Sequence, residues 1–188
     1  GYELITVQNV TTNNMTIAFY SCGFQAGDKI QFLKLVTNWA NTINAQSWTA
    51  GYSNRIKVVA VMTNDGISGI NGNTAPNSDT ALGGYISGGS SLRHDLSKYL
   101  DIREAAGLDG SIPVIVLNIG DYLGTTLSSR TTITTNADSQ IFVHETAGHL
   151  LPGFTYPARQ CCEDEYADPL NTSQNSTNVA STLTEATN

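Results

Sequence analysis

The residues best suited to chemistry lie in one segment, FVHETAGHLLPGF, at positions 142–154. This segment carries two histidines, His144 and His149, and one glutamate, Glu145, among mostly apolar neighbours. Burying such polar side chains in an apolar helix is costly unless they are paired or bound to a metal. Histidine nitrogens and carboxylate oxygens are also common zinc ligands. The segment therefore indicates a candidate metal site.

The spacing of the histidines leaves three interpretations open. The zinc-protease motif His-Glu-x-x-His places its histidines four residues apart, whereas His144 and His149 are five apart. On a regular helix, at about 100° per residue, a five-residue step turns the two side chains about 140° away from each other. A π-bulge at residues 146–148 would correct this difference, because such a bulge adds one residue to a helix. Otherwise Glu145 and His149 form the ligand pair, or the histidines make hydrogen bonds without a metal.

The apolar pattern around this segment predicts a layered α/β domain. Strands are expected where β-branched or continuous apolar residues occur, at positions 2–7, 15–20, 55–63 and 112–119. The metal-site helix is expected over residues 137–151, between a cap at Asn136 or Asp138 and a stop at Pro152. Two polar segments, 64–80 and 120–136, are expected to be loops.

Two further helices are expected to position these strands. The first begins at Asp28 and carries its apolar face on positions three and four apart: Ile30, Leu33, Val36, Ala40 and Ile43. The second lies around residues 92–100 and contains His94, which we expect on the polar surface rather than at a metal. No internal repeat is visible in the chain.

Composition excludes several classes of partner. With 9 basic and 16 acidic residues, the formal net charge of −7 argues against nucleic acid or an anionic membrane as the partner. No apolar run approaches the roughly 20 residues that span a bilayer. The charged fraction, 13%, is below the usual quarter or so. Thr and Asn residues take the place of charged ones, and such a composition favours an extracellular, secreted location for the protein.

Glycosylation and disulfide signals agree with that location. Four Asn-x-Ser/Thr sequons begin at Asn9, Asn14, Asn171 and Asn175. The three cysteines are Cys22, Cys161 and Cys162. An odd count leaves one thiol over or shared with another chain. A bridge from Cys22 to one of the adjacent pair is predicted, and three free thiols are the alternative.

The residues after His149 resemble the IgA-peptidase type of zinc metallopeptidase. The helix of that family reads His-Glu-x-x-His-x-x-x-Gly and runs quickly into Asp-Glu-Tyr. Here Gly153 follows the second histidine by four residues, and Asp164-Glu165-Tyr166 comes next. Other stretches are similar to the family in the same order along the chain: 17–28, with Cys22 in place of the usual Asp, 79–86, 114–124 and 178–188.

The resemblance implies a zincin-like α/β domain: a mixed sheet with a long N-terminal helix and a central metal-site helix. It places a metallopeptidase-like catalytic domain at residues 1–170, with residues 171–188 as a Thr/Ser/Asn-rich tail or the start of a truncated segment. The implied function is that of a secreted zinc (Zn2+) endopeptidase that hydrolyses peptide bonds with a metal-activated water. Protein or peptide would be the substrate.

The resemblance also implies a role for each residue of the site. His144, His149 and Asp164 are the implied zinc ligands, and Glu163 and Glu165 remain open as alternatives to Asp164. Glu145 is the implied general base that takes a proton from the metal-bound water, with Tyr166 as a second catalytic residue close by.

Two departures from the family pattern fall on the ligands. One residue is inserted between the histidines, and about eight more, 155–162, separate Gly153 from the Asp-Glu-Tyr. A disulfide from Cys161 or Cys162 could hold that second insertion so that Asp164 still reaches the helix. The departures keep a second function open. It is a catalytically inactive domain with the peptidase fold, serving as a structural or binding unit in self-assembly or with another extracellular protein.

Overall fold

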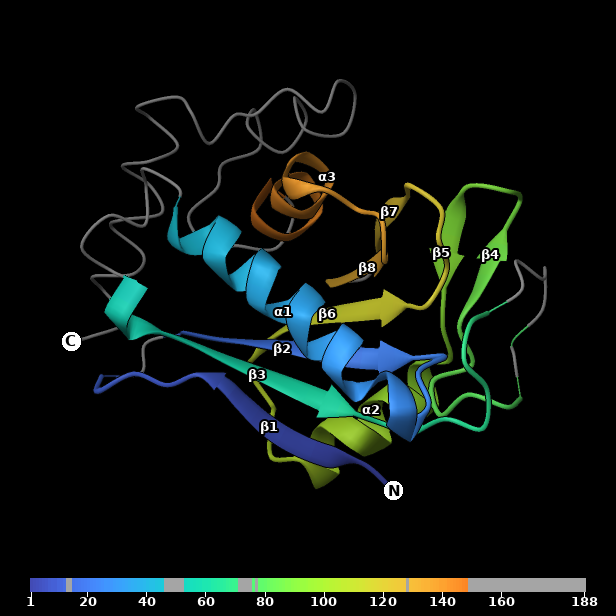
Figure 1. Cartoon of the computed structure of the whole chain (residues 1–188), viewed down its shortest axis with the longest axis horizontal. Helices are drawn as coiled ribbons and strands as arrows, with labels where there is room; N and C mark the ends of the chain where they lie inside the picture. The colour runs from blue at the N-terminus through green and yellow to red at the C-terminus, as the bar shows by residue number, and fades with distance from the viewer. Residues whose placement is uncertain (13–14, 46–52, 71–75, 77, 128, 149–188) are drawn as a thin grey trace.

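The computed structural model describes residues 1–12, 15–45, 53–70, 76, 78–127 and 129–148. Within these residues the chain forms a six-stranded mixed sheet in the order β1-β3-β2-β6-β8-β7, shown in Figure 1. The strands are β1 (Glu3–Gln8), β2 (Met15–Cys22), β3 (Ile56–Met62), β6 (Ile112–Leu117), β7 (Gly124–Leu127) and β8 (Arg130–Thr134). The α/β class predicted from the sequence is confirmed.

The four central strands are parallel and both edge strands are antiparallel. β3, β2, β6 and β8 run in one direction, whereas β1 pairs antiparallel with β3 and β7 pairs antiparallel with β8. The strands β2, β3 and β6 are buried almost throughout, as expected for parallel strands covered on both faces. A separate two-stranded sheet is formed by β4 (Tyr85–Ser87) and β5 (Ser91–Arg93).

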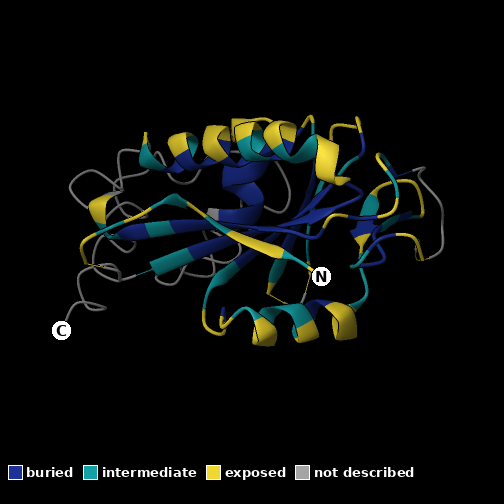
Figure 2. Ribbon diagram, turned by 60° about the horizontal axis from the view of Figure 1, so that its bottom comes forward, coloured by how far each residue is buried: buried dark blue, intermediate teal, exposed yellow. Residues whose placement is uncertain are grey.

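Helices cover both faces of the large sheet. α1 (Lys29–Asn44) connects β2 to β3, with short 3-10 turns at Ala26–Asp28 and Ser53–Arg55. α3 (Ser139–Val143) packs beside α1. α2 (Leu96–Ala105) lies on the opposite face, as Figure 2 shows from the side. Among the described helices, none combines the length and apolar character that crossing a membrane needs.

Alternation along the central strand β2 divides the interior into two clusters. Ile17 and Phe19 belong to the cluster under α1 and α3. Ala18, Tyr20 and Cys22 belong to the cluster on the α2 side. Successive side chains of a strand point to opposite faces, so a single buried strand supplies both cores.

Three details of the sequence prediction were wrong. Residues 120–136 are not a loop, because they contain the β7–β8 hairpin. The helix expected around 92–100 begins only at Leu96, after β5, and Asp95 caps it by accepting a hydrogen bond from the Lys98 amide at 3.1 Å. Ile30 is 71% exposed, because the buried face of α1 is rotated toward Phe32, Val36 and Trp39.

Aromatic packing fixes α3 on the sheet. The ring of Phe142 lies 5.9 Å from the ring of Phe19 on β2 and 6.0 Å from the ring of Trp39 on α1. The Trp39 indole also donates a hydrogen bond to the Ala137 carbonyl at 3.1 Å, just before α3 begins. The segment that carries His144 and Glu145 is therefore anchored by side chains from two other elements.

We predict that Phe142→Ala will lower the free energy of unfolding by about 3–5 kcal/mol, because it removes a fully buried ring and leaves a cavity. Urea unfolding followed by tryptophan fluorescence measures the loss. The matched control is Phe142→Leu, which refills most of the space and should cost less than half as much. Equal losses in the two variants would show that Phe142 does not anchor α3 through its ring.

Candidate active site

The site is built on a helix that changes type at His144. Asp138 begins α3, since its carboxylate accepts a hydrogen bond from the Ile141 amide at 3.0 Å. After Val143 the chain continues as a π-helical turn, η4 (His144–Gly148). The predicted start near Asp138 is confirmed. A π turn at this place was part of one of the three interpretations of the histidine spacing, and the shared metal that this interpretation requires stays a prediction.

The π turn changes which residues share a face. Its hydrogen bonds join residue i to residue i+5, so one turn closes over one residue more than in an α-helix. Residues five apart therefore take the relative positions that residues four apart have in an α-helix. His149 lies outside the described residues, so its side chain is not part of the geometry given below.

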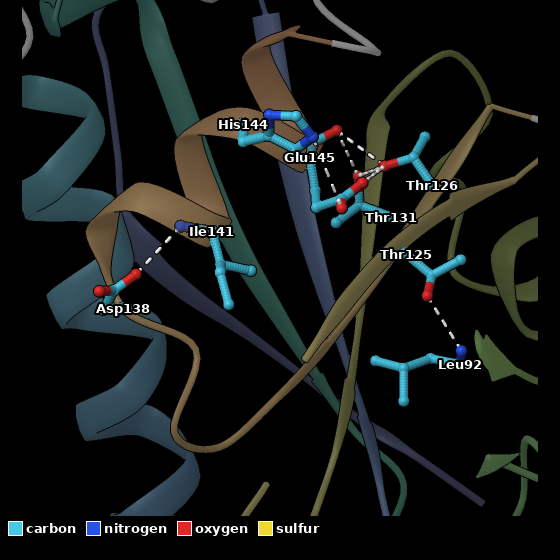
Figure 3. A network of polar contacts seen from close by, with 8 residues as sticks. All are labelled: Leu92, Thr125, Thr126, Thr131, Asp138, Ile141, His144 and Glu145. Atoms are coloured by element: carbon cyan, nitrogen blue, oxygen red, sulfur yellow. Dashed lines mark hydrogen bonds and ion pairs between the residues drawn. The ribbon is translucent and has the colours of Figure 1, made fainter. Parts of the chain in front are cut away.

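Two threonines of the β7–β8 hairpin hold Glu145, as Figure 3 shows. Thr126 and Thr131 are directly opposite each other on the two strands, with hydroxyl oxygens 3.2 Å apart. The Thr126 hydroxyl lies 2.6 Å from Oε2 of Glu145, and the Thr131 hydroxyl lies 2.9 Å from the Glu145 carbonyl oxygen. Each hydroxyl has one proton to donate. Thr126 at the shorter distance therefore binds the carboxylate, and Thr131 binds the backbone of the π turn.

Gly124 lets the helix approach β7 this closely. A Cβ atom at this position would lie 2.5 Å from Cγ2 of Ile141 and 2.9 Å from Cγ of Glu145. Any larger residue would push the helix away from the hairpin. The absence of a side chain at Gly124 is thus a condition for the contact between Glu145 and Thr126.

His144 and Glu145 form a buried polar pair. Each is only 5% exposed, and Nε2 of His144 lies 3.9 Å from Oε1 of Glu145. The two carboxylate oxygens of Glu145 thus have different surroundings: Oε2 is bound by Thr126, and Oε1 faces the imidazole. A buried carboxylate is tolerated when it accepts short hydrogen bonds of this kind.

The other residues of the predicted metal site lie outside the described residues: His149, Glu163, Asp164, Glu165 and Tyr166. Within the ranges that the structure describes, no group of three His, Cys, Asp or Glu side chains is close enough to hold an ion. The full ligand set therefore stays a prediction.

Cys22 is a buried thiol at the end of β2. Burial raises its pKa to about 12, because the thiolate would lose its hydration, and a hydrogen bond with Thr80 opposes this only in part. Cys22 belongs to the cluster on the α2 side of the sheet, away from Glu145. Its predicted partners, Cys161 and Cys162, lie outside the described residues, so the bridge stays a prediction.

Of the four predicted glycosylation sites, only Asn9 lies within the described residues. Asn9 lies just after β1 and is exposed, with its side-chain oxygen accepting a hydrogen bond from the Val10 amide at 3.0 Å. Asn14, Asn171 and Asn175 lie outside the described residues. Modification of all four sites stays a prediction.

The sequence predicted His94 on a polar helix surface, and this prediction was wrong. It precedes α2, is half-buried, and accepts a hydrogen bond at Nε2 from Nε of Arg130, 2.9 Å away. Its ring meets the ring of Tyr99 edge-on at 5.8 Å between centroids. Local sequence patterns could not predict these contacts, because Arg130 is 36 residues away in the chain.

Sequence reasoning also missed Thr126, Thr131 and Gly124. The signal for the hairpin was present in GTTLSSRTTITT at residues 124–135, where β-branched residues flank two serines. No protein-family model matches the chain, and a search of curated proteins finds no significant match. The family resemblance therefore rests on the motifs of this sequence alone.

We predict that Thr126→Val will lower the free energy of unfolding by about 1.5–3 kcal/mol, the usual loss for a hydrogen bond to a charged group. The replacement keeps the shape of the side chain and removes its hydroxyl. Thr126→Ser is the matched control, which keeps the hydroxyl and should retain most of the stability. Urea unfolding at neutral pH measures both variants, and a valine variant as stable as wild type would show that this hydrogen bond does not hold Glu145.

Proposed function

We propose that this protein is a zinc-dependent, endopeptidase-like domain that acts outside the cell. The single observation that carries the proposal is the π turn at His144–Gly148, at the position where the sequence has one residue too many for a zinc-protease helix. Beside that turn, the glutamate expected to act as general base is buried and held by a hydrogen bond.

The residues present fit a zinc ion. In a π turn, residues five apart return to one face, so a turn that continued to His149 would give the two histidines the relation that the His-Glu-x-x-His motif gives its two ligands. Two imidazoles with the carboxylate of Asp164 would form a donor set typical of a catalytic zinc site, in which three protein ligands leave one position open. Glu163 and Glu165 remain alternatives to Asp164.

The arrangement of the helices supports a zincin-like layering. The long helix α1 follows the first central strand, and the helix that carries His144 packs beside it on the same face of a mixed sheet. These are the features that the family resemblance implies: a long N-terminal helix, a mixed sheet and a metal-site helix. Tyr166 would complete the site from the segment that follows the helix.

A bound zinc ion supplies a Lewis acid that polarises the scissile carbonyl and lowers the pKa of water toward neutrality. The chain itself supplies the movement of the proton. Glu145 would accept a proton from the attacking water and deliver it to the leaving amine. Because Thr126 holds Oε2, we assign the proton transfer to Oε1, which lies on the side of His144. Thr131 would keep the backbone of Glu145 in place during this exchange.

One observation favours the second candidate, an inactive domain with a structural or binding role. The eight residues at 155–162 stand between the helix and the predicted third ligand, where the family pattern has a short connection. If they keep Asp164 from the metal, two imidazoles could still bind zinc without supporting hydrolysis. Metal content and activity therefore have to be measured separately.

We predict one zinc per chain in the purified protein, measured by elemental analysis after dialysis. His149→Ala should lose the metal, because it removes one of two imidazole ligands. His94→Ala is the matched control, since His94 lies on the other face of the hairpin and should leave the zinc content unchanged.

We further predict that Glu145→Gln will keep zinc and lower kcat/KM by about 100- to 10,000-fold, the usual contribution of a general base. Cleavage of a quenched fluorescent peptide library measures this loss. Zinc binding without hydrolysis by the wild type would favour the inactive domain. Absence of zinc from the wild type at neutral pH, even after incubation with excess zinc, would contradict the peptidase proposal and favour the inactive domain.

A further inference from the structure

A small cavity lies on the face of the β7–β8 hairpin opposite Glu145. Its volume is about 100 Å³, and its polar lining consists of Arg93, His94, Thr125, Arg130 and Thr132. Thr125 and Thr132 are a cross-strand pair next to Thr126 and Thr131. Because side chains alternate along a strand, one pair faces the cavity and the other faces Glu145. We call these five residues the arginine pocket.

The hydrogen bond between His94 and Arg130 defines the protonation state of this pocket. Nε of Arg130 donates to Nε2 of His94, so this nitrogen must be the unprotonated one. Burial, together with the positive charge of Arg130, lowers the pKa of His94 to about 4, and the negative charge of Asp95 opposes this only in part. His94 is therefore neutral near pH 7 and acts as an acceptor for the guanidinium.

Among the described residues that line the cavity, Arg93 and Arg130 are basic and none is acidic. Tyr99 of α2 presents its ring to both His94 and Arg130, with the Arg130 guanidinium carbon 5.6 Å from the ring centroid. Arg103 contacts the same ring at 5.8 Å but is also paired with Asp109 at 2.8 Å.

Asp95 is the acidic neighbour of His94, and its carboxylate caps α2. Arg130 is half-buried, and this partial loss of hydration lowers the pKa of its guanidinium. A partly dehydrated cation at the wall of a cavity favours a negatively charged occupant.

The donors in the pocket match an oxyanion. A guanidinium presents planar, forked N–H groups that fit carboxylate and phosphate oxygens, and threonine hydroxyls can donate to the same oxygens. The volume of about 100 Å³ holds several water molecules, and hence a group of four or five heavy atoms rather than a whole metabolite.

We propose that the arginine pocket binds a small oxyanion group, a carboxylate or a phosphate, through Arg93 and Arg130. An anion there would offset the charge that Arg130 exerts on His94. Protonation of His94 and binding of the anion should then favour each other. Binding does not require a metal, because the pocket and Glu145 lie on opposite faces of the hairpin.

The test is an NMR titration of the full chain with inorganic phosphate and, separately, with acetate, at constant ionic strength set by sodium chloride. The chain has three histidines, and His94→Asn assigns the ring signal of His94. We expect a saturable change in this signal and a rise of about one unit or more in the pKa of His94 from its value near 4. A response to phosphate alone identifies a phosphate ligand, and a response to acetate alone identifies a carboxylate ligand. Either response supports the proposal.

Variants separate the pocket from general charge effects. Arg130→Gln should abolish the anion response, and Arg93→Gln should weaken binding by about tenfold or more. Arg93 is exposed, so its variant keeps the test open if Arg130→Gln does not fold. Arg55→Gln, in the 3-10 turn before β3, is the matched control and should respond as wild type does. No response at His94, an equal response to chloride, or an unchanged response in Arg93→Gln would overturn the proposal.

Discussion

A carboxylate removed from water needs hydrogen bonds from donors that are already in place, and in this molecule that requirement falls on Glu145. The donor is the hydroxyl of Thr126 on an edge strand, 2.6 Å from the carboxylate. The neighbouring Thr131 hydroxyl binds the Glu145 carbonyl in the π turn. A π turn departs from the regular helical pattern and is rare. Here the hairpin provides hydrogen bonds to both the side chain and the backbone of the turn, so the unusual helix and the polar side chain are stabilised together.

The remaining structure brings the helix and the hairpin to this distance. The parallel strands β2 and β6 form the rigid centre of the sheet, and β8 extends it so that β7 can pair at the edge. Phe142 and Trp39 fix the start of the helix over β2. Gly124 has no side chain, so the helix can contact the hairpin at this position. A change in any of these contacts would move Glu145 relative to Thr126 and, with it, the carboxylate oxygen that faces His144.

The β7–β8 hairpin contributes to two sites of opposite charge, one that contains the carboxylate of Glu145 and one that contains arginine. One face of β7 and β8 carries the threonines that bind Glu145, Thr126 at the carboxylate and Thr131 at the backbone carbonyl. The other face lines a cavity with Arg130, and β5 adds Arg93 to the same cavity. The alternation of side chains is enough to separate the two, although they are one residue apart in the sequence. Occupation of the arginine pocket would also add contacts to the strands on which Glu145 depends.

The local patterns in the sequence were sufficient for much of the fold. Continuous Val, Ile and Ala residues located β3 and β6, and the approximate range of α1 followed from its periodicity. The β7–β8 hairpin was not predicted, because its threonines lack the apolar character that marks a buried strand, and its burial depends on a helix that follows it in the chain. The exposure of Ile30 was missed because Phe32, Val36 and Trp39 decide how α1 is rotated. For the site, the five-residue spacing of the histidines made a π turn one of three interpretations. The residues that stabilise this turn lie on the β7–β8 hairpin, and the spacing of the histidines carries no information about them.

The most direct measurement is an X-ray absorption spectrum at the zinc edge of the zinc-loaded chain, compared with the spectra of His144→Ala and His149→Ala. If the π turn directs both imidazoles at one ion, the wild-type spectrum should contain two imidazole ligands at about 2.0–2.1 Å. Each variant, which would release zinc on dialysis, should show one imidazole fewer when it is measured with zinc added back. A spectrum in which either substitution leaves the number of imidazole ligands unchanged would contradict the central claim, because it would show that the inserted residue keeps the two histidines apart.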